Sequence, residues 1–521
     1  MFGAFPITPT WPPAVNPEDV PEPTQISLPA YQPIAEDDNV ADKSLSLPTL
    51  LQGTGRDSIV LGRTSLLALG VNLTPDVQIQ DLLPSTACLP DFASWDTYSS
   101  EQALEYDGHH PGVLRNGAPS PGCHVYLERR RELTNTNEDA FRTVRRITPP
   151  KGKQQARLGN AYEFFRCLEL FTGFWDDTSQ PPNLPPSPEL TASDAAAPES
   201  PPDSGQDQPP ASTRIFSGAS MPAEYRQHLL NAFIKLVAYD FGCNVSMARV
   251  EPRLHLQSPP GRHERKSYTP SNCHFVFQSP TTREDARLGV VWGPVAAVTA
   301  RPTVDFTTPD AETAQSQDLA REVTAALITA QHRNREGKEE VRFGHEKWWS
   351  TKHRWGGGVG GPIGREIEKS SATAATAATA GDGNTSAGQK DNVHDGPANK
   401  KARRTLPIYD NYRMVRPPPS SWDRKARYEA IGKTPGTTYD DIFILSSLFH
   451  HMSILRVRVP TRLLDVLDGS PEPDATKRSW GKVEAWRSPW YDFFQVDQRV
   501  AAMQSIWAVM AHLMRGGEHG K

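Results

Sequence analysis

Apolar residues recur at three- and four-residue spacing in the stretch that follows Met221, which is the pattern of a helix with one buried face. The positions that form this stripe are Tyr225, Leu229, Leu230, Phe233, Leu236 and Val237. We expect Ser220 to cap this helix, Pro222 to lie just inside its first turn, and Gly242 to end it.

Three β-rich runs follow this helix, and a second helix closes the unit. The runs span residues 244–256, 273–278 and 288–300, and the second helix spans about 311–333. An α-β-β-β-α order with short loops predicts that the helices pack on a sheet. The expected fold class is therefore α+β, with two ordered lobes and a C-terminal α-rich region that packs on them.

Further elements are predicted on both sides of this unit. Helices are expected at 137–147, with Glu138 and Arg142 spaced for an ion pair, and at 155–175. In the C-terminal region, 442–449 reads as a buried helix or strand, 454–459 as a strand, and 462–467 as a short helix.

The final predicted helix, 497–514, carries an apolar seam that is too hydrophobic to face water. The seam consists of Val500, Met503, Trp507, Met510 and Met514. It packs either on the core of the same chain or on a second chain. We favour the same chain, because a helix of barely two heptads is short for a coiled coil.

Composition divides the chain into ordered and disordered parts. The sequence contains 48 Pro in 521 residues, and its hydrophobic content of 37% is low for a globular chain. Proline-rich, acidic or small-residue segments bury too little apolar surface to offset the entropy of ordering. We expect disorder at 1–57, 179–213 and 369–405, ordered lobes at 58–178 and 214–368, a C-terminal region at 406–515, and a tail at 516–521. Within the leader, Tyr31 is one of a few aromatic residues that could dock on the protein itself or on a partner.

Charge and cysteine usage narrow the class of protein. The formal net charge of −5 argues against a protein that coats nucleic acid along its length. The five cysteines are scattered and form no C-x-x-C pair, which favours free thiols in a reducing compartment. With no signal-peptide pattern and no apolar run long enough to span a bilayer, we expect an intracellular protein without a membrane partner.

No stretch carries a catalytic, metal-binding or cofactor-binding signature, so we expect no cofactor, metal or catalytic residue. A G-x-G-x-x-G match at 356–361 follows from six glycines in nine residues and lacks a βαβ context. His109 and His110 are adjacent, and adjacent histidines do not ligate one metal comfortably. The alternative is an enzyme of unidentified class, with a site in loop 107–124 or loop 345–364.

A segment rich in tryptophan and cations is a possible interaction surface. It comprises Trp348, Trp349, Lys352, Arg354 and Trp355. Aromatic rings and cations suit stacking on bases and contact with phosphates, or contact with a protein partner. They equally suit a strand whose tryptophans complete the core while its cations face water.

Two basic clusters are candidate nuclear-import signals. Four cations in five residues, Lys400, Lys401, Arg403 and Arg404, lie in a segment that we expect to be exposed, where an import receptor could bind them. The run Arg129–Arg131 is weaker, because it lies in a regular segment whose solvated face explains it. We therefore expect a nuclear, non-enzymatic interaction or regulatory protein. Its expected partners are a further protein and a nuclear-import receptor, and cytoplasmic localisation is the alternative.

Overall fold

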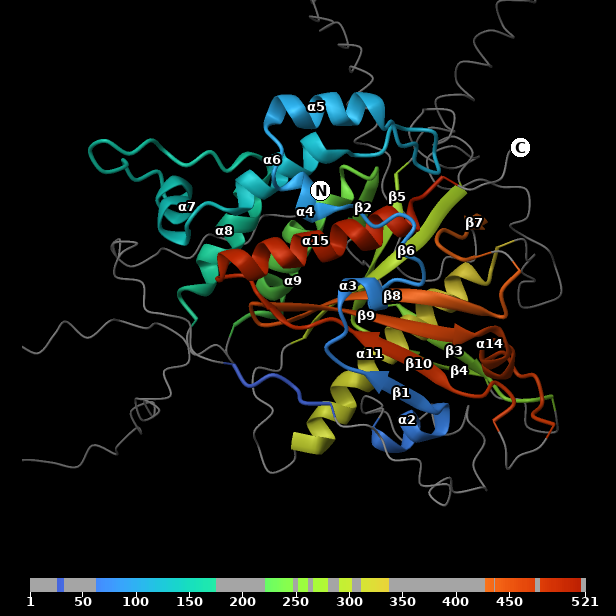
Figure 1. The fold of residues 1–521 in the computed structure, drawn as a ribbon. Helices are drawn as coiled ribbons and strands as arrows, with labels where there is room; N and C mark the ends of the chain where they lie inside the picture. The colour runs from blue at the N-terminus through green and yellow to red at the C-terminus, as the bar shows by residue number, and fades with distance from the viewer. Residues whose placement is uncertain are drawn as a thin grey trace, which may run out of the picture.

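The structure is a computed structural model, and it describes residues 26–31, 62–174, 221–246, 252–260, 266–279, 290–301, 311–336, 427–434, 436–473 and 478–516. Within these residues the fold is α+β, as the sequence predicts. A mixed nine-stranded sheet lies between two layers of helices, and a separate two-stranded sheet accompanies it (Figure 1).

The bounds of the elements follow. The helices are α2 Arg63–Leu69, α3 Ile79–Leu82, α4 Phe92–Trp95, α5 Ser100–His109, α6 Cys123–Leu133, α7 Asn137–Val144, the short 3-10 helix η2 Gly159–Ala161, α8 Tyr162–Phe171, α9 Ala223–Ala238, α11 Ala311–Arg333, α14 Thr461–Leu467 and α15 Val496–Leu513. The strands are β1 Val71–Thr74, β2 Cys243–Ser246, β3 Arg253–Gln257, β4 Lys266–Pro270, β5 Cys273–Gln278, β6 Val290–Arg301, β7 Arg427–Glu429, β8 Tyr439–Leu448, β9 His451–Pro460, β10 Val483–Arg487 and β11 Tyr491–Asp492.

The large sheet joins strands from distant parts of the sequence. Its order is β1-β10-β9-β8-β6-β5-β2, with β11 beside β9 and β7 beside β6. β8 and β9 form an antiparallel hairpin, whereas β6 pairs with β8 and β1 with β10 in parallel. Consequently β1, β6, β8 and β10 all run in one direction, and their carboxyl ends meet at one edge of the sheet.

Alternation along the strands directs side chains to two different helix layers. On β8, Phe443 and Leu445 belong to the core beneath α9 and α15, whereas Ile442 and Ile444 belong to the core beneath α11, α14 and α2. Figure 1 shows α15 and α9 on one side of the sheet and α11 and α2 on the other. The sheet is therefore buried on both faces.

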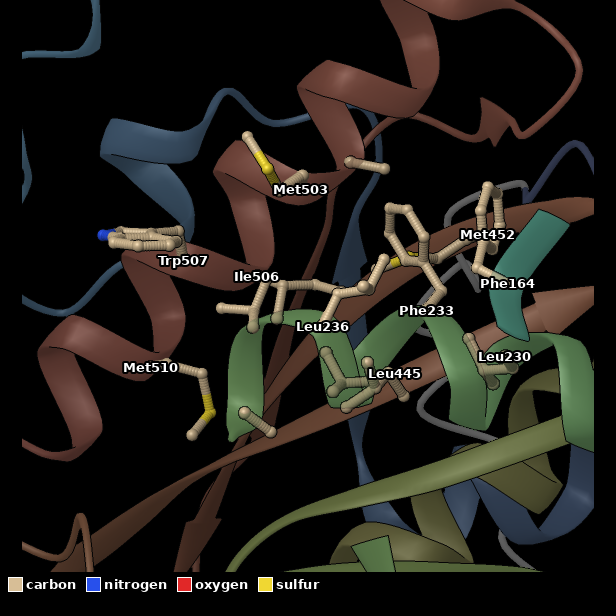
Figure 2. Packing of buried hydrophobic residues seen from close by; sticks show 14 of the residues in the cluster. Phe164, Leu230, Phe233, Leu236, Leu445, Met452, Met503, Ile506, Trp507 and Met510 are labelled. Carbon is tan, nitrogen blue, oxygen red and sulfur yellow. The ribbon is translucent and has the colours of Figure 1, made fainter. Parts of the chain in front are cut away.

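The apolar seam of α15 is buried within the same chain. Met503, Trp507 and Met510 are at most 1% exposed. The Trp507 ring contacts Tyr126 of α6 at a centroid distance of 5.7 Å and Phe241 after α9 at 5.3 Å. Figure 2 shows the residues of α15 packing with those of α9, including Leu236 and Phe233.

The structure refines several predicted elements. The helices predicted at 311–333 and 497–514 are found within a residue of those bounds, as α11 and α15. Pro222 is the N-cap of α9 rather than a residue of its first turn, and Ser220 lies outside the described residues. The single run predicted at 244–256 contains two strands, β2 and β3, in different sheets, and β4 was not predicted.

The C-terminal region, which was expected to be α-rich, contains more strand than its hydrophobic pattern predicts. Residues 442–448 and 454–459 lie in the two strands of the β8–β9 hairpin, and β7, β10 and β11 also come from this part of the chain. None of the described helices is long and apolar enough to cross a membrane.

We predict that Trp507→Ala lowers the free energy of unfolding by roughly 3–5 kcal/mol, because it leaves a cavity between α15, α6 and the end of α9. Denaturant unfolding measures the loss, and light scattering checks that the mass in solution does not change. A change of mass with unaltered stability would contradict burial of the seam within one chain.

Candidate functional site

The carboxyl edge of the parallel strands carries a group of buried polar side chains, which we call the carboxyl-edge cluster. In open sheets of parallel strands this edge is where ligands usually bind. The cluster consists of Tyr31, Arg301, Asp318, Glu322, Ser446 and Arg487. Arg301 is the last residue of β6 and Arg487 the last of β10, whereas Asp318 and Glu322 extend from α11 above them.

Glu322 is the centre of the cluster. Its carboxylate pairs with Arg301 at an Nη1–Oε1 distance of 2.6 Å and with Arg487 through the other oxygen. The Ser446 hydroxyl also donates to Glu322, and Thr299 contacts Ser446 through their hydroxyl oxygens at 3.1 Å. The Glu322 carboxylate is thereby bound from three strands: β6, β8 and β10.

Asp318 is the second carboxylate, one helical turn before Glu322. It pairs with Arg301 at an Nε–Oδ1 distance of 2.9 Å. Its other oxygen accepts a hydrogen bond of 2.8 Å from the Tyr31 hydroxyl. Two guanidinium groups therefore face two carboxylates, and the formal charges of these four side chains cancel.

The short segment 26–31 covers this cluster. The Arg487 guanidinium lies 4.6 Å from the centre of the Tyr31 ring and 5.2 Å from that of Trp490, as expected for cation–π contact. Ile26 packs on the hydrophobic core beneath α9 and α15, and Pro29 is buried. This part of the predicted disordered leader is therefore packed on the fold, and Tyr31 docks on the protein itself.

Burial and pairing act on the pKa values in opposite directions. The side chains of Arg301, Asp318, Glu322 and Arg487 are all at most 4% exposed. Burial raises the pKa of Glu322, but the charges of Arg301 and Arg487 outweigh it, so this pKa lies below its usual value. Burial prevails at Asp318, whose pKa is raised.

Burial likewise raises the pKa of the Tyr31 phenol well above its usual value. Glu322 is thus held ionised and Tyr31 protonated, and neither is poised for proton transfer near neutral pH. The arrangement is that of an ion-pair network that fixes α11 on the sheet.

The loop 107–124, the first of the two loops considered for an enzyme site, is also used structurally. The Asp107 carboxylate accepts hydrogen bonds from the backbone N–H groups of Cys123 (2.7 Å) and His124 (2.9 Å) at the start of α6. Burial raises the pKa of the Cys123 thiol to about 11, which disfavours the nucleophilic thiolate. The second loop, 345–364, lies outside the described residues.

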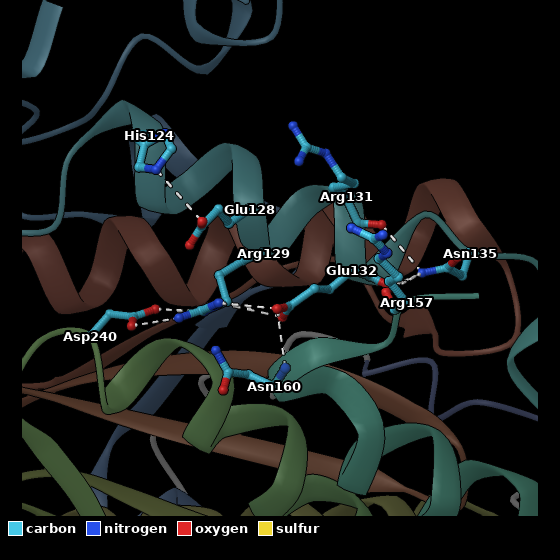
Figure 3. A network of polar contacts seen from close by, with 9 residues as sticks. All are labelled: His124, Glu128, Arg129, Arg131, Glu132, Asn135, Arg157, Asn160 and Asp240. Carbon is cyan, nitrogen blue, oxygen red and sulfur yellow. Dashed lines mark hydrogen bonds and ion pairs between the residues drawn. The ribbon is translucent and has the colours of Figure 1, made fainter. Parts of the chain in front are cut away.

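The run Arg129–Arg131 lies on helix α6, and Arg129 departs from the interpretation of this run as a solvated face. Arg129 is 8% exposed, and its guanidinium binds both oxygens of Asp240, at 2.8 and 2.9 Å. It also contacts Glu132, whose carboxylate accepts from the N–H of Asn160 (Figure 3). Arg129 therefore links α6, the end of α9 and η2, and it is not available to an import receptor.

The residues proposed for partner contact and nuclear import all lie outside the described residues. These are Trp348, Trp349, Lys352, Arg354 and Trp355, and the basic cluster Lys400, Lys401, Arg403 and Arg404. The structure therefore does not place them. Comparison with family models, curated proteins and solved structures found no match for this chain.

Sequence reasoning missed the charged members of the carboxyl-edge cluster. Arg301 directly follows the apolar run 288–300, and a charge at the end of a buried strand marks such an edge. Asp318 and Glu322 are four residues apart and so share one face of α11. The strand-end position of Arg301 and the spacing of Asp318 and Glu322 are therefore visible in the sequence. Neither signal shows that these side chains pair with one another.

We predict that Glu322→Gln lowers the free energy of unfolding by roughly 3–5 kcal/mol at pH 7, because it leaves Arg301 and Arg487 without their shared carboxylate. Since the pKa of Glu322 is lowered by folding, its contribution is present above the unfolded value of 4.5 and is lost as pH falls further. The difference between wild type and variant should therefore shrink at acidic pH. Urea unfolding at several pH values measures it.

A matched control lies on the same helix. Glu312 pairs with Arg63, but their side chains are 73% and 51% exposed. Glu312→Gln should change the unfolding free energy by less than about 1 kcal/mol. Equal effects of the two substitutions would contradict the role of the buried network.

Proposed function

We propose that this chain is a nuclear interaction or regulatory protein that binds another protein and does not itself catalyse a reaction. The observation that supports this proposal is the self-neutralised state of the carboxyl-edge cluster. A site that binds a charged substrate needs an unbalanced charge of its own to attract it. Here Arg301 and Arg487 face Asp318 and Glu322, and Tyr31 covers them.

The use of loop 107–124 is consistent with a non-enzymatic role. Its carboxylate, Asp107, caps helix α6, and its buried thiol, Cys123, has a raised pKa. Both groups thus have structural explanations. The enzyme alternative accordingly rests on loop 345–364.

The nuclear part of the proposal rests on the basic cluster. Lys400, Lys401, Arg403 and Arg404 supply four cations in five residues of a chain whose net charge is −5. The acidic groove of an import receptor complements such a run. The proposed partners are therefore an import receptor at this cluster and a second protein elsewhere on the chain.

The import signal can be tested by replacing all four basic residues of the cluster with Ala in a fluorescently tagged protein. We expect the tagged protein to shift to the cytoplasm, since a chain of 57.6 kDa plus its tag enters the nucleus slowly by diffusion. The control variant exchanges Lys and Arg at the same four positions and keeps the charge. An unchanged distribution of the Ala variant would remove the support for nuclear import.

The partner surface is proposed to include Trp348, Trp349 and Trp355. We predict that replacing all three with Ala abolishes recovery of a specific nuclear protein in affinity purification and leaves the unfolding midpoint unchanged. A lowered midpoint would instead assign these side chains to the core.

The two neighbouring cations distinguish a protein partner from nucleic acid. Lys352→Gln with Arg354→Gln should leave recovery of the protein partner largely intact. Loss of a salt-sensitive nucleic-acid complex in this double variant would contradict a protein partner.

A further inference from the structure

Three potential metal ligands meet where the β8–β9 hairpin turns. His450 lies in the turn, His451 begins β9, and Asp492 ends β11. Asp492 and His451 are directly opposite each other in the antiparallel pairing of β11 with β9. Two imidazoles and one carboxylate thus come from two segments of the chain.

The turn explains why two adjacent histidines lie together here. Neighbouring residues of a strand point to opposite faces, so an H-H pair within a strand separates its rings. Phe449, before the pair, has a positive φ of 49°, and the chain therefore reverses at this point. The two imidazole rings consequently lie with their centroids 4.3 Å apart.

The distances suit a shared cation. The ligand atoms of the three side chains lie within 4.8 Å of one another. His450 Nε2 and Asp492 Oδ1 are 3.5 Å apart. Two ligands that bind zinc at about 2.0–2.1 Å with a tetrahedral angle are separated by about 3.4 Å.

Neighbouring groups hold the Asp492 carboxylate in place, whereas one nitrogen of the His451 ring has no hydrogen-bond partner among the described residues. Asp492 Oδ1 accepts a hydrogen bond of 2.8 Å from the Phe494 N–H, which orients the carboxylate as outer-shell partners do at metal sites. His451 Nδ1 is buried and has no hydrogen-bond partner among the described residues. His450 itself is 1% exposed, whereas the Asp492 side chain is 13% exposed. The carboxylate is thus anchored by the backbone and partly exposed to solvent.

One positive charge opposes a cation at this position. The charge of Arg499 acts on Asp492. Its guanidinium, however, donates to Asn137 Oδ1 at 2.8 Å, to the Asn135 carbonyl at 2.9 Å and to the Phe493 carbonyl at 3.2 Å. Arg499 is thus held in place by these other acceptors.

We propose that His450, His451 and Asp492 bind one divalent transition-metal cation, with Zn²⁺ as the best match. Imidazole and carboxylate donors suit Zn²⁺, Co²⁺ or Fe²⁺ better than Ca²⁺ or Mg²⁺, which prefer oxygen ligands only. Three protein ligands leave the fourth position of a tetrahedral site to water or to a ligand atom. This site is independent of the proposed interaction function.

The test uses the untagged full-length protein after treatment with a chelator. Co²⁺ is the probe, because its visible absorption distinguishes tetrahedral from octahedral coordination. We expect one equivalent of Co²⁺ to bind with tetrahedral character and Zn²⁺ to displace it. Zn²⁺ should also raise the unfolding midpoint, because a cation that binds only the folded state stabilises it.

Two variants remove one ligand each. His451→Ala and Asp492→Asn should each weaken Co²⁺ binding by more than about tenfold. Loss of an outer-shell partner alone weakens metal binding by about tenfold or more, and loss of a direct ligand should have a larger effect. Asp492→Asn retains an oxygen for the Phe494 N–H and so preserves the local fold. The control is His124→Ala, which removes a helical histidine that pairs with Glu128 and should leave binding unchanged.

Unfolding midpoints in the absence of metal show whether each variant is folded. If His451→Ala fails to fold, Asp492→Asn decides the question. The proposal is overturned if the wild type binds no Co²⁺, or if folded Asp492→Asn binds it as tightly as the wild type.

Discussion

The burial of charged side chains between helix α11 and the large sheet is the constraint on which this structure depends. Near its middle, α11 carries Asp318 and Glu322 to the arginines that end β6 and β10. At its last residue, Arg333 binds the Pro294 carbonyl and the Asp440 carboxylate. Glu322 and Arg333 are eleven residues apart, or about 16 Å along a helix. Two ion-paired points at that separation fix both the rotation and the position of α11 on the sheet.

The buried ion pairs contribute more to the choice of one position for α11 than to the free energy of unfolding. Burying an ion pair costs desolvation that its Coulomb attraction only partly returns, whereas a mispositioned charge in the same place costs several kcal/mol. Any shift of α11 along the sheet would leave Arg301, Arg487 or Asp440 unpaired. The partners also come from β6, β8 and β10, which are far apart in sequence, so the network can form only when the middle and C-terminal parts of the chain have joined one sheet.

The sequence predicts well those elements whose apolar spacing or hydrophobicity is visible within one short segment. Helices α11 and α15 follow from their length and apolar spacing, and the buried runs of the β8–β9 hairpin follow from their hydrophobicity. The single run predicted at 244–256 is instead two strands, β2 and β3, which pair with different partners. The carboxyl-edge cluster could not be assembled from sequence. Glu322 is separated from Ser446 by 124 residues and from Arg487 by 165, and an acidic residue in a helix ordinarily faces water.

The two polar clusters of the sheet differ in their balance of charge. In the carboxyl-edge cluster each carboxylate meets a guanidinium, so the formal charges of the paired groups cancel. At the hairpin turn the side chains are two imidazoles and one carboxylate, and His451 Nδ1 has no partner among the described residues. The rule that adjacent histidines point apart holds along a strand, but it fails where Phe449 reverses the chain. Equal and opposite charges therefore make the first cluster a structural element, whereas the unused lone pair of His451 at the second is what a cation would satisfy.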